Sequence, residues 1–216
     1  MTPVGSLGDF ALRGGANSFE AFGRLPSKDA LVLDVPFDRQ GNRIACGAHV
    51  LASVVRYWRP AETVTGRAIF ASHPPADGKA GYSMQELVTL AGEYGISAYG
   101  VRLEEADLVA ELEKGRPVLA PVLLPFVYEQ SASLFDPDPA LVSQLKSWSL
   151  GAIGTASEMT GSGMLAHYVL VVGHAKDRFV LLDPVLGYRT IAKSRLARYR
   201  ASYEGASLIF SSKPAS

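Results

Sequence analysis

Several features are missing from this sequence of 216 residues, and each absence excludes a class of protein. The chain has one cysteine, which excludes an internal disulfide framework and any zinc site built from several cysteines. Its 21 basic and 21 acidic residues cancel, so charge gives no reason to expect nucleic acid or a charged membrane surface as a partner. No apolar run approaches the roughly 20 residues of a membrane-spanning helix, and we find no internal repeat.

The beginning of the chain also lacks an export signal. Residues 1–10 contain no basic segment followed by an apolar stretch, which a signal peptide requires. We therefore expect either a cytoplasmic protein or an exported protein whose leader has been removed. Residues 1–30 are rich in Gly, Ala and Ser and have weak periodicity, so we interpret them as an N-terminal arm before one domain at residues 31–212.

The composition of the chain is that of a compact globular domain, with 48% hydrophobic and 19% charged residues. Apolar periodicity and capping signals predict helices at residues 46–58, 62–72, 84–94, 104–114 and 194–199. Apolar runs bounded by turn residues predict strands at residues 31–36, 96–103, 117–123, 167–173, 178–183, 188–192 and 207–210. Helices first and antiparallel strands second indicate an α+β fold.

The connection at residues 124–166 is long for a compact domain. It contains one predicted helix at residues 140–150 and then a stretch rich in Gly, Ser and Thr. Connections of this length are often lids or binding loops. We interpret it as an insertion or substrate loop that borders the functional cleft.

The single cysteine, Cys46, has the surroundings of a reactive thiol. It stands at the start of a predicted helix, where unsatisfied N–H groups and the helix dipole favour a thiolate. The polar segment 38–45 before it argues against deep burial, and Gly47 after it lets the backbone approach a substrate closely. The alternative is a buried cysteine that simply begins a core helix.

A cysteine nucleophile needs a base, and the base needs a group that orients it. Among the four histidines, His167 opens an apolar strand, where histidine is unusual. If the strands at 168–173 and 178–183 form a hairpin, His167 lies opposite Asp183 or two residues away, within reach of a hydrogen bond. The alternatives are a histidine satisfied within the sheet and an aspartate that ends a strand.

The tetrahedral intermediate of acyl transfer also needs donors for its negative oxygen. The backbone N–H of Cys46 is one candidate. The side-chain amide of Gln40, six residues earlier, is a second. Taken alone, Gln40 reads as a solvated loop residue.

Together these segments resemble the bacteriocin-processing (double-glycine leader) cysteine peptidases and their stand-alone relatives, which have a papain-like fold. That family has a glutamine six residues before Cys-Gly, then a histidine followed by an aromatic residue and valines, and Asp-Pro about sixteen residues later. The pattern is carried here by residues 40–48 (QGNRIACGA), 167–173 (HYVLVVG) and 182–184 (LDP). Residues 81–96 and 115–120 are also similar, and the resemblance covers roughly residues 31–210.

The resemblance implies a cysteine peptidase that uses no metal or other cofactor. In it Cys46 is the nucleophile, His167 the general base, Asp183 the group that orients the histidine, and Gln40 the oxyanion donor. The implied reaction is cleavage of a peptide bond through an acyl-enzyme.

The resemblance also implies what the enzyme acts on. Gly47 and Tyr168, the aromatic residue after the histidine, are expected to bind the substrate, a peptide or protein. In the family this is often a leader or short peptide cut after two small residues, commonly Gly-Gly. The resemblance allows an association with an export system, and the chain's own Gly14-Gly15 is a candidate self-processing site.

Three other interpretations stay open. The chain could be a catalytically silent peptide-binding module of the same fold. The same thiol, histidine and aspartate also serve acyltransferases and amide hydrolases, because all of these reactions pass through a thioester. A mixed metal site from Cys46, His49, His167 and Asp183 is the third, since Cys-x-x-His spacing can bind zinc.

Overall fold

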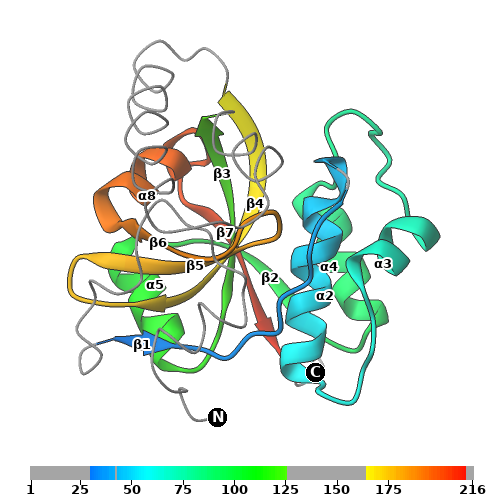
Figure 1. The fold of residues 1–216 in the computed structure, drawn as a ribbon, viewed down its shortest axis with the longest axis horizontal. Coiled ribbons are helices and arrows are strands. Elements are labelled where there is room, and N and C mark those ends of the chain that lie inside the picture. Colours follow the sequence, from blue (N-terminus) through cyan, green and yellow to red (C-terminus); the bar gives the residue numbers. More distant parts are fainter. Residues whose placement is uncertain (1–29, 42, 126–163, 213–216) are drawn as a thin grey trace, which may run out of the picture.

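The computed structural model describes residues 30–41, 43–125 and 164–212, which form helices packed on an antiparallel sheet (Figure 1). In chain order the elements are β1 (Leu31–Val32), η2 (Arg43–Ala45), α2 (Cys46–Trp58), α3 (Gly66–Ser72), α4 (Met84–Glu93), β2 (Ser97–Arg102), α5 (Glu105–Glu113), β3 (Val118–Pro125), β4 (Met164–His174), β5 (Arg178–Asp183), β6 (Gly187–Ala192), α8 (Lys193–Arg200), η3 (Ala201–Tyr203) and β7 (Ala206–Ser211). The N-terminal arm to residue 29 and the helix expected at 140–150 lie outside the described residues.

The sheet has the strand order β2-β7-β3-β4-β5-β6, and β1 also pairs with β4. Every one of these pairings is antiparallel. Helices α2, α3 and α4 gather on one side of the sheet, and α5 and α8 lie on the other (Figure 1). The expected α+β class, with helices first and an antiparallel sheet second, is confirmed. Among the described helices, none has the length and apolar character needed to cross a membrane.

Local sequence signals account for the ends of several helices. The Ser83 hydroxyl accepts a hydrogen bond from the Glu86 amide (3.2 Å), and the Glu86 carboxylate accepts one from the Ser83 amide (2.6 Å). This reciprocal pair is the predicted capping box of α4. Helices α4 and α5 are followed by Gly95 and Gly115, whose φ values of +65° and +74° suit glycine.

Some boundaries differ from the prediction. Helix α3 begins at Gly66 rather than residue 62, because Thr65 is its N-cap and accepts a hydrogen bond from the Ala68 amide (3.2 Å). Strands β3 and β4 extend into the expected loop at 124–166, where Leu124 pairs with Leu165. The remainder of that segment, residues 126–163, is outside the described residues.

The segment after β1 leaves the sheet but stays attached to it. The amide of Leu33 donates to the carbonyl of Val172 in β4 (2.8 Å). The hydroxyl of buried Tyr188 donates to the carbonyl of Val35 (2.5 Å) and accepts a hydrogen bond from its amide (3.1 Å). These bonds lead the chain across the sheet toward the start of α2, where Cys46 lies.

The antiparallel pairing of β1 with β4, in which Val32 lies opposite Gly173, requires glycine at position 173. A Cβ there would overlap the carbonyl oxygen of Leu31 and crowd Val32. We expect Gly173→Ala to lower the free energy of unfolding by about 1–3 kcal/mol, the usual cost of overpacking. Gly92→Ala is the control, because no atom lies within 4 Å of a Cβ at that position in α4. Urea denaturation measures both, and equal stability of the two variants would contradict the prediction.

Candidate active site

Cys46 is the first residue of α2, as the sequence predicts. Its N-cap is Ala45, which has no side chain able to accept hydrogen bonds from the first amides of the helix. The expectation that Cys46 avoids deep burial is wrong, since the residue is only 8% exposed. The last three residues before it, Arg43–Ala45, form the short helix η2 and continue directly into α2, so they do not hold the thiol out in solvent.

His167 and Asp183 come together on the sheet half of the site. His167 lies in β4 and Asp183 is the last residue of β5. Both are buried, and His167 Nε2 lies 3.3 Å from Asp183 Oδ1. The side chain of Cys46 also acts on the ring, because it is among the groups that raise the pKa of His167.

The strand register explains how this pair meets. The hairpin closes with a bond from the Ala175 amide to the Arg178 carbonyl (2.8 Å), and a bulge at Val171–Gly173 then shifts the pairing. Beyond the bulge Leu170 pairs with Leu182, so His167 lies diagonally across from Asp183 and on the same face. This is the second of the two predicted registers; direct opposition does not occur.

Several donors surround the Asp183 carboxylate. Its Oδ1 accepts hydrogen bonds from the amides of Val185 (2.8 Å) and Leu186 (3.2 Å), and Arg189 Nη1 lies 3.6 Å from Oδ2. Burial by itself raises the pKa of Asp183, but the charge and hydrogen bond of His167, the charge of Arg189 and the Val185 amide lower it to about 2. The carboxylate is therefore ionised at neutral pH.

The same environment sets the charge of the histidine. Burial by itself lowers the pKa of His167, but the charge and hydrogen bond of Asp183, followed by the contact with Cys46, raise it to about 10. The ring is therefore an imidazolium at neutral pH.

Gln40 lies beside this group, in the segment that precedes η2. Its backbone N–H donates to the carbonyl of Pro184 (2.7 Å), the residue after Asp183. The side chain of Gln40 is half-buried. The structure thus brings Gln40 to the turn that follows the Asp183 strand, although the two are far apart in sequence.

The two expected substrate-binding residues have different surroundings. Gly47 is buried, and a Cβ there would lie 3.1 Å from Leu87 and 3.2 Å from Tyr82, so packing against α4 already explains its small size. Tyr168 is half-buried, and its hydroxyl donates to the carbonyl of Tyr82 (3.0 Å). Burial and then the charge of Cys46 raise the pKa of Tyr168, which places its ring near the thiol.

Two residues near the site were missed by sequence reasoning. Arg189 faces Asp183 from β6, where an arginine in a strand ordinarily reads as a solvent-facing residue. Tyr203 in η3 lies near Cys46, since burial and then the charge of Cys46 raise the pKa of Tyr203. Nothing in the local pattern around either residue indicates these partners.

The alternative metal site does not assemble from its four candidates. The ring of His49 is turned to Asp38 rather than to the pair of His167 and Asp183. Within residues 30–41, 43–125 and 164–212, no three His, Cys, Asp or Glu side chains are grouped so that they could hold a metal ion.

Comparisons with known proteins agree with one another on the fold. The model of the family described as "Peptidase_C39 like family" matches residues 32–207. A search of curated proteins found no match. Among solved structures, a double glycine motif protease from an AMS/PCAT transporter, in complex with its leader peptide, is 19% identical, with a TM-score of 0.51 and coverage of 85% of this chain and 94% of that one.

Two further structures are similar. The peptidase domain of Streptococcus ComA, a bi-functional ABC transporter, is 14% identical, with a TM-score of 0.52 and coverage of 82% of this chain and 97% of that one. Xylellain, a cysteine protease from Xylella fastidiosa, is 14% identical, with a TM-score of 0.54 and coverage of 100% and 91%. The fold of the chain is therefore papain-like, as the sequence resemblance implied.

The charge of His167 can be tested directly by NMR. In the wild type we expect the ring to stay protonated until the pH approaches 10. Asp183→Asn keeps an acceptor for the backbone amides but removes the charge that contributes most to raising the pKa of His167, so this pKa falls well below its wild-type value. The pKa of His174, which burial lowers, serves as the internal reference in both proteins. A wild-type His167 ring that titrates near pH 6.5 would contradict the assignment.

Proposed function

The chain belongs to the Peptidase_C39 like family of cysteine peptidases, and we propose that it cleaves peptide bonds with Cys46 as nucleophile, His167 as acid and base, and Asp183 as the orienting group. The observation that carries the proposal is the placement of His167 between a buried carboxylate and the only thiol of the chain. This order of thiol, imidazole and carboxylate is what nucleophilic catalysis by cysteine needs.

The charge of each group fits one step of the reaction. The Cys46 thiolate attacks the carbonyl carbon of the scissile bond, and the His167 imidazolium then gives its proton to the leaving amine. The neutral ring next takes a proton from water, which hydrolyses the thioester and releases the acid product. Asp183 keeps the ring oriented through both steps and stabilises its positive form.

The oxyanion that forms in both steps needs donors, and we assign the Gln40 side chain and the Cys46 backbone N–H to this role. Two features support it. Gln40 is held next to the Asp183 strand through Pro184. The N-cap of α2, Ala45, has no side-chain acceptor, so no capping side chain competes with an oxyanion for the amides at the start of the helix.

We propose a leader or short peptide as substrate, cut after small residues such as Gly-Gly. The similar AMS/PCAT structure is described as a double glycine motif protease bound to a leader peptide. In this chain the charge of Cys46 contributes to raising the pKa of both Tyr168 and Tyr203, so both hydroxyls lie within electrostatic range of the thiol. Tyr168 and the backbone at Gly47 are proposed to contact the peptide. Because two similar structures are described as coming from transporters, we propose an export system as the source or destination of the peptide.

The test is a digestion of a peptide library in which Gly-Gly, Ala-Gly, Leu-Leu and other pairs precede a common sequence. We expect the wild type to cut after Gly-Gly, with the position read by mass spectrometry. Cys46→Ala removes the nucleophile and abolishes cleavage. Gln40→Ala lowers kcat about 100- to 1000-fold, the usual effect of losing one oxyanion donor.

The controls separate the alternatives. A peptide product that carries an added amine in place of water would identify an acyltransferase. Binding of the peptides without cleavage, together with slow alkylation of Cys46 by iodoacetamide, would identify a silent binding module and contradict the proposal. Cleavage that survives in Cys46→Ala would exclude Cys46 as the nucleophile.

A further inference from the structure

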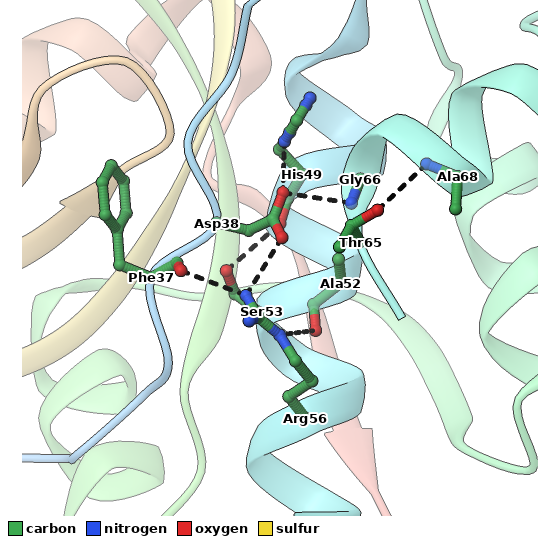
Figure 2. A network of polar contacts seen from close by, with 9 residues as sticks. All are labelled: Phe37, Asp38, His49, Ala52, Ser53, Arg56, Thr65, Gly66 and Ala68. Carbon is green, nitrogen blue, oxygen red and sulfur yellow. Dashed lines mark hydrogen bonds and ion pairs between the residues drawn. The ribbon is translucent and has the colours of Figure 1, made fainter. Parts of the chain in front are cut away.

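Beside the candidate active site, a buried network of charges joins the segment before Cys46 to two helices (Figure 2). Asp38 is 7% exposed, and its Oδ1 contacts His49 Nδ1 and accepts a hydrogen bond from the Gly66 amide (3.0 Å). Its Oδ2 accepts one from Arg56 Nη2 (3.1 Å). His49 and Arg56 lie on α2, and Gly66 is the first residue of α3. The peptidase reaction described above uses none of these groups.

The parts of the network fit closely together. Nη2 of Arg56 also donates to the carbonyl of Phe37 (3.1 Å), so one guanidinium holds two consecutive residues of the segment. A Cβ at Gly66 would overlap the backbone and ring of His49, so only glycine lets α3 begin this near to α2. Figure 2 shows His49, Gly66 and Arg56 converging on the Asp38 carboxylate from different directions.

Gln40 lies between this network and the sheet half of the site. It follows Asp38 by two residues, a chain length of about 7 Å at most. Its own amide is bonded to Pro184, next to Asp183. The segment 38–40 is therefore fixed at one end to the helix that begins with Cys46 and at the other to the turn after β5.

We propose that Asp38 is a positioning residue, whose contacts with α2 and α3 hold the Gln40 side chain in register with Cys46 for stabilisation of the oxyanion. The inference rests on the proposed function, because Gln40 is given its role there. The effect is large for a small displacement, since a donor misplaced by about 1 Å can cost about 100-fold in rate. Formation of the thiolate does not involve Gln40, so it is independent of Asp38.

The kinetic test compares Asp38→Asn, Gln40→Ala and the double variant on the Gly-Gly peptide. We expect Asp38→Asn to lower kcat about 10- to 100-fold with little change in KM, and to leave alkylation of Cys46 by iodoacetamide within about twofold of wild type. The kcat of the double variant should lie within about twofold of that of Gln40→Ala, because both changes remove the same interaction. Losses that multiply in the double variant would overturn the proposal.

Glu111→Gln is the matched control for a purely structural effect. Glu111, on α5, is also a buried carboxylate, 9% exposed, and it pairs with Lys114 (2.7 Å) and Arg116 (3.1 Å), which both follow that helix. We expect it to lower the melting temperature, as Asp38→Asn does, and to leave kcat unchanged. If Asp38→Asn and Glu111→Gln lose the same fraction of kcat for the same drop in melting temperature, Asp38 acts through stability and the positioning role is wrong.

A second measurement keeps the inference separate from the proposed function. The Gln40 amide is hydrogen-bonded in the native protein, so its exchange with deuterated water reports the position of the segment whether or not the protein cleaves any peptide. We expect Asp38→Asn to accelerate exchange at Gln40 about tenfold or more, and Glu111→Gln to leave it unchanged. A wild type that cuts no peptide contradicts the proposed function. Unchanged exchange at Gln40 in Asp38→Asn contradicts the positioning role.

Discussion

The site depends on one constraint, which is that an ionised carboxylate is buried at the end of β5. Asp183 is 2% exposed, and a carboxylate removed from water is costly unless charges and hydrogen bonds compensate it. His167, Arg189 and the amides of the following turn supply that compensation. The same contacts that make the burial tolerable also fix the ring of His167 and keep it charged. The pair of His167 and Asp183 therefore serves both the stability of this part of the fold and the charge of the histidine, so a change to one residue affects both.

The two halves of the site come from different layers of the fold. The thiol lies on a helix whose inward side chains Leu51, Val54 and Val55 are fully buried, whereas the histidine and aspartate lie on the sheet. The distance between thiol and ring is thus set by how α2 packs on β4, and a rigid interior holds it. The segment from Leu33 to Gln40 connects the halves along its length, because it bonds to the sheet and to α2 in turn.

Much of this could be read from the sequence because the relevant signals are local. The helix that begins at Cys46, the capping box at Ser83 and the glycines that end two helices are short-range patterns, and each was predicted. The meeting of His167 and Asp183 was also predicted, since a hairpin fixes residues close in sequence to within one register step.

What the sequence did not reveal involves contacts between distant segments or a break in regularity. The bulge at Val171–Gly173 decides between two registers. Gly173 indicates an irregularity in the strand, but a glycine alone does not specify how the register shifts. Arg189 reads as an ordinary polar strand residue until its carboxylate partner is known. Asp38 and His49 read as a loop residue and a helix residue, and their contact depends on how closely α3 approaches α2 at Gly66.

The segment 38–40 is positioned by polar and charged contacts rather than by apolar packing. Arg39 and Gly41 are exposed, so there is little apolar surface through which hydrophobic packing could define its position. In the proposed mechanism the Gln40 side chain donates to the oxyanion. One backbone hydrogen bond, from the Gln40 amide to the Pro184 carbonyl, attaches the end of the segment that lies near β5. A buried aspartate with several directional partners fixes the other end, and directional contacts specify a position where non-directional burial cannot.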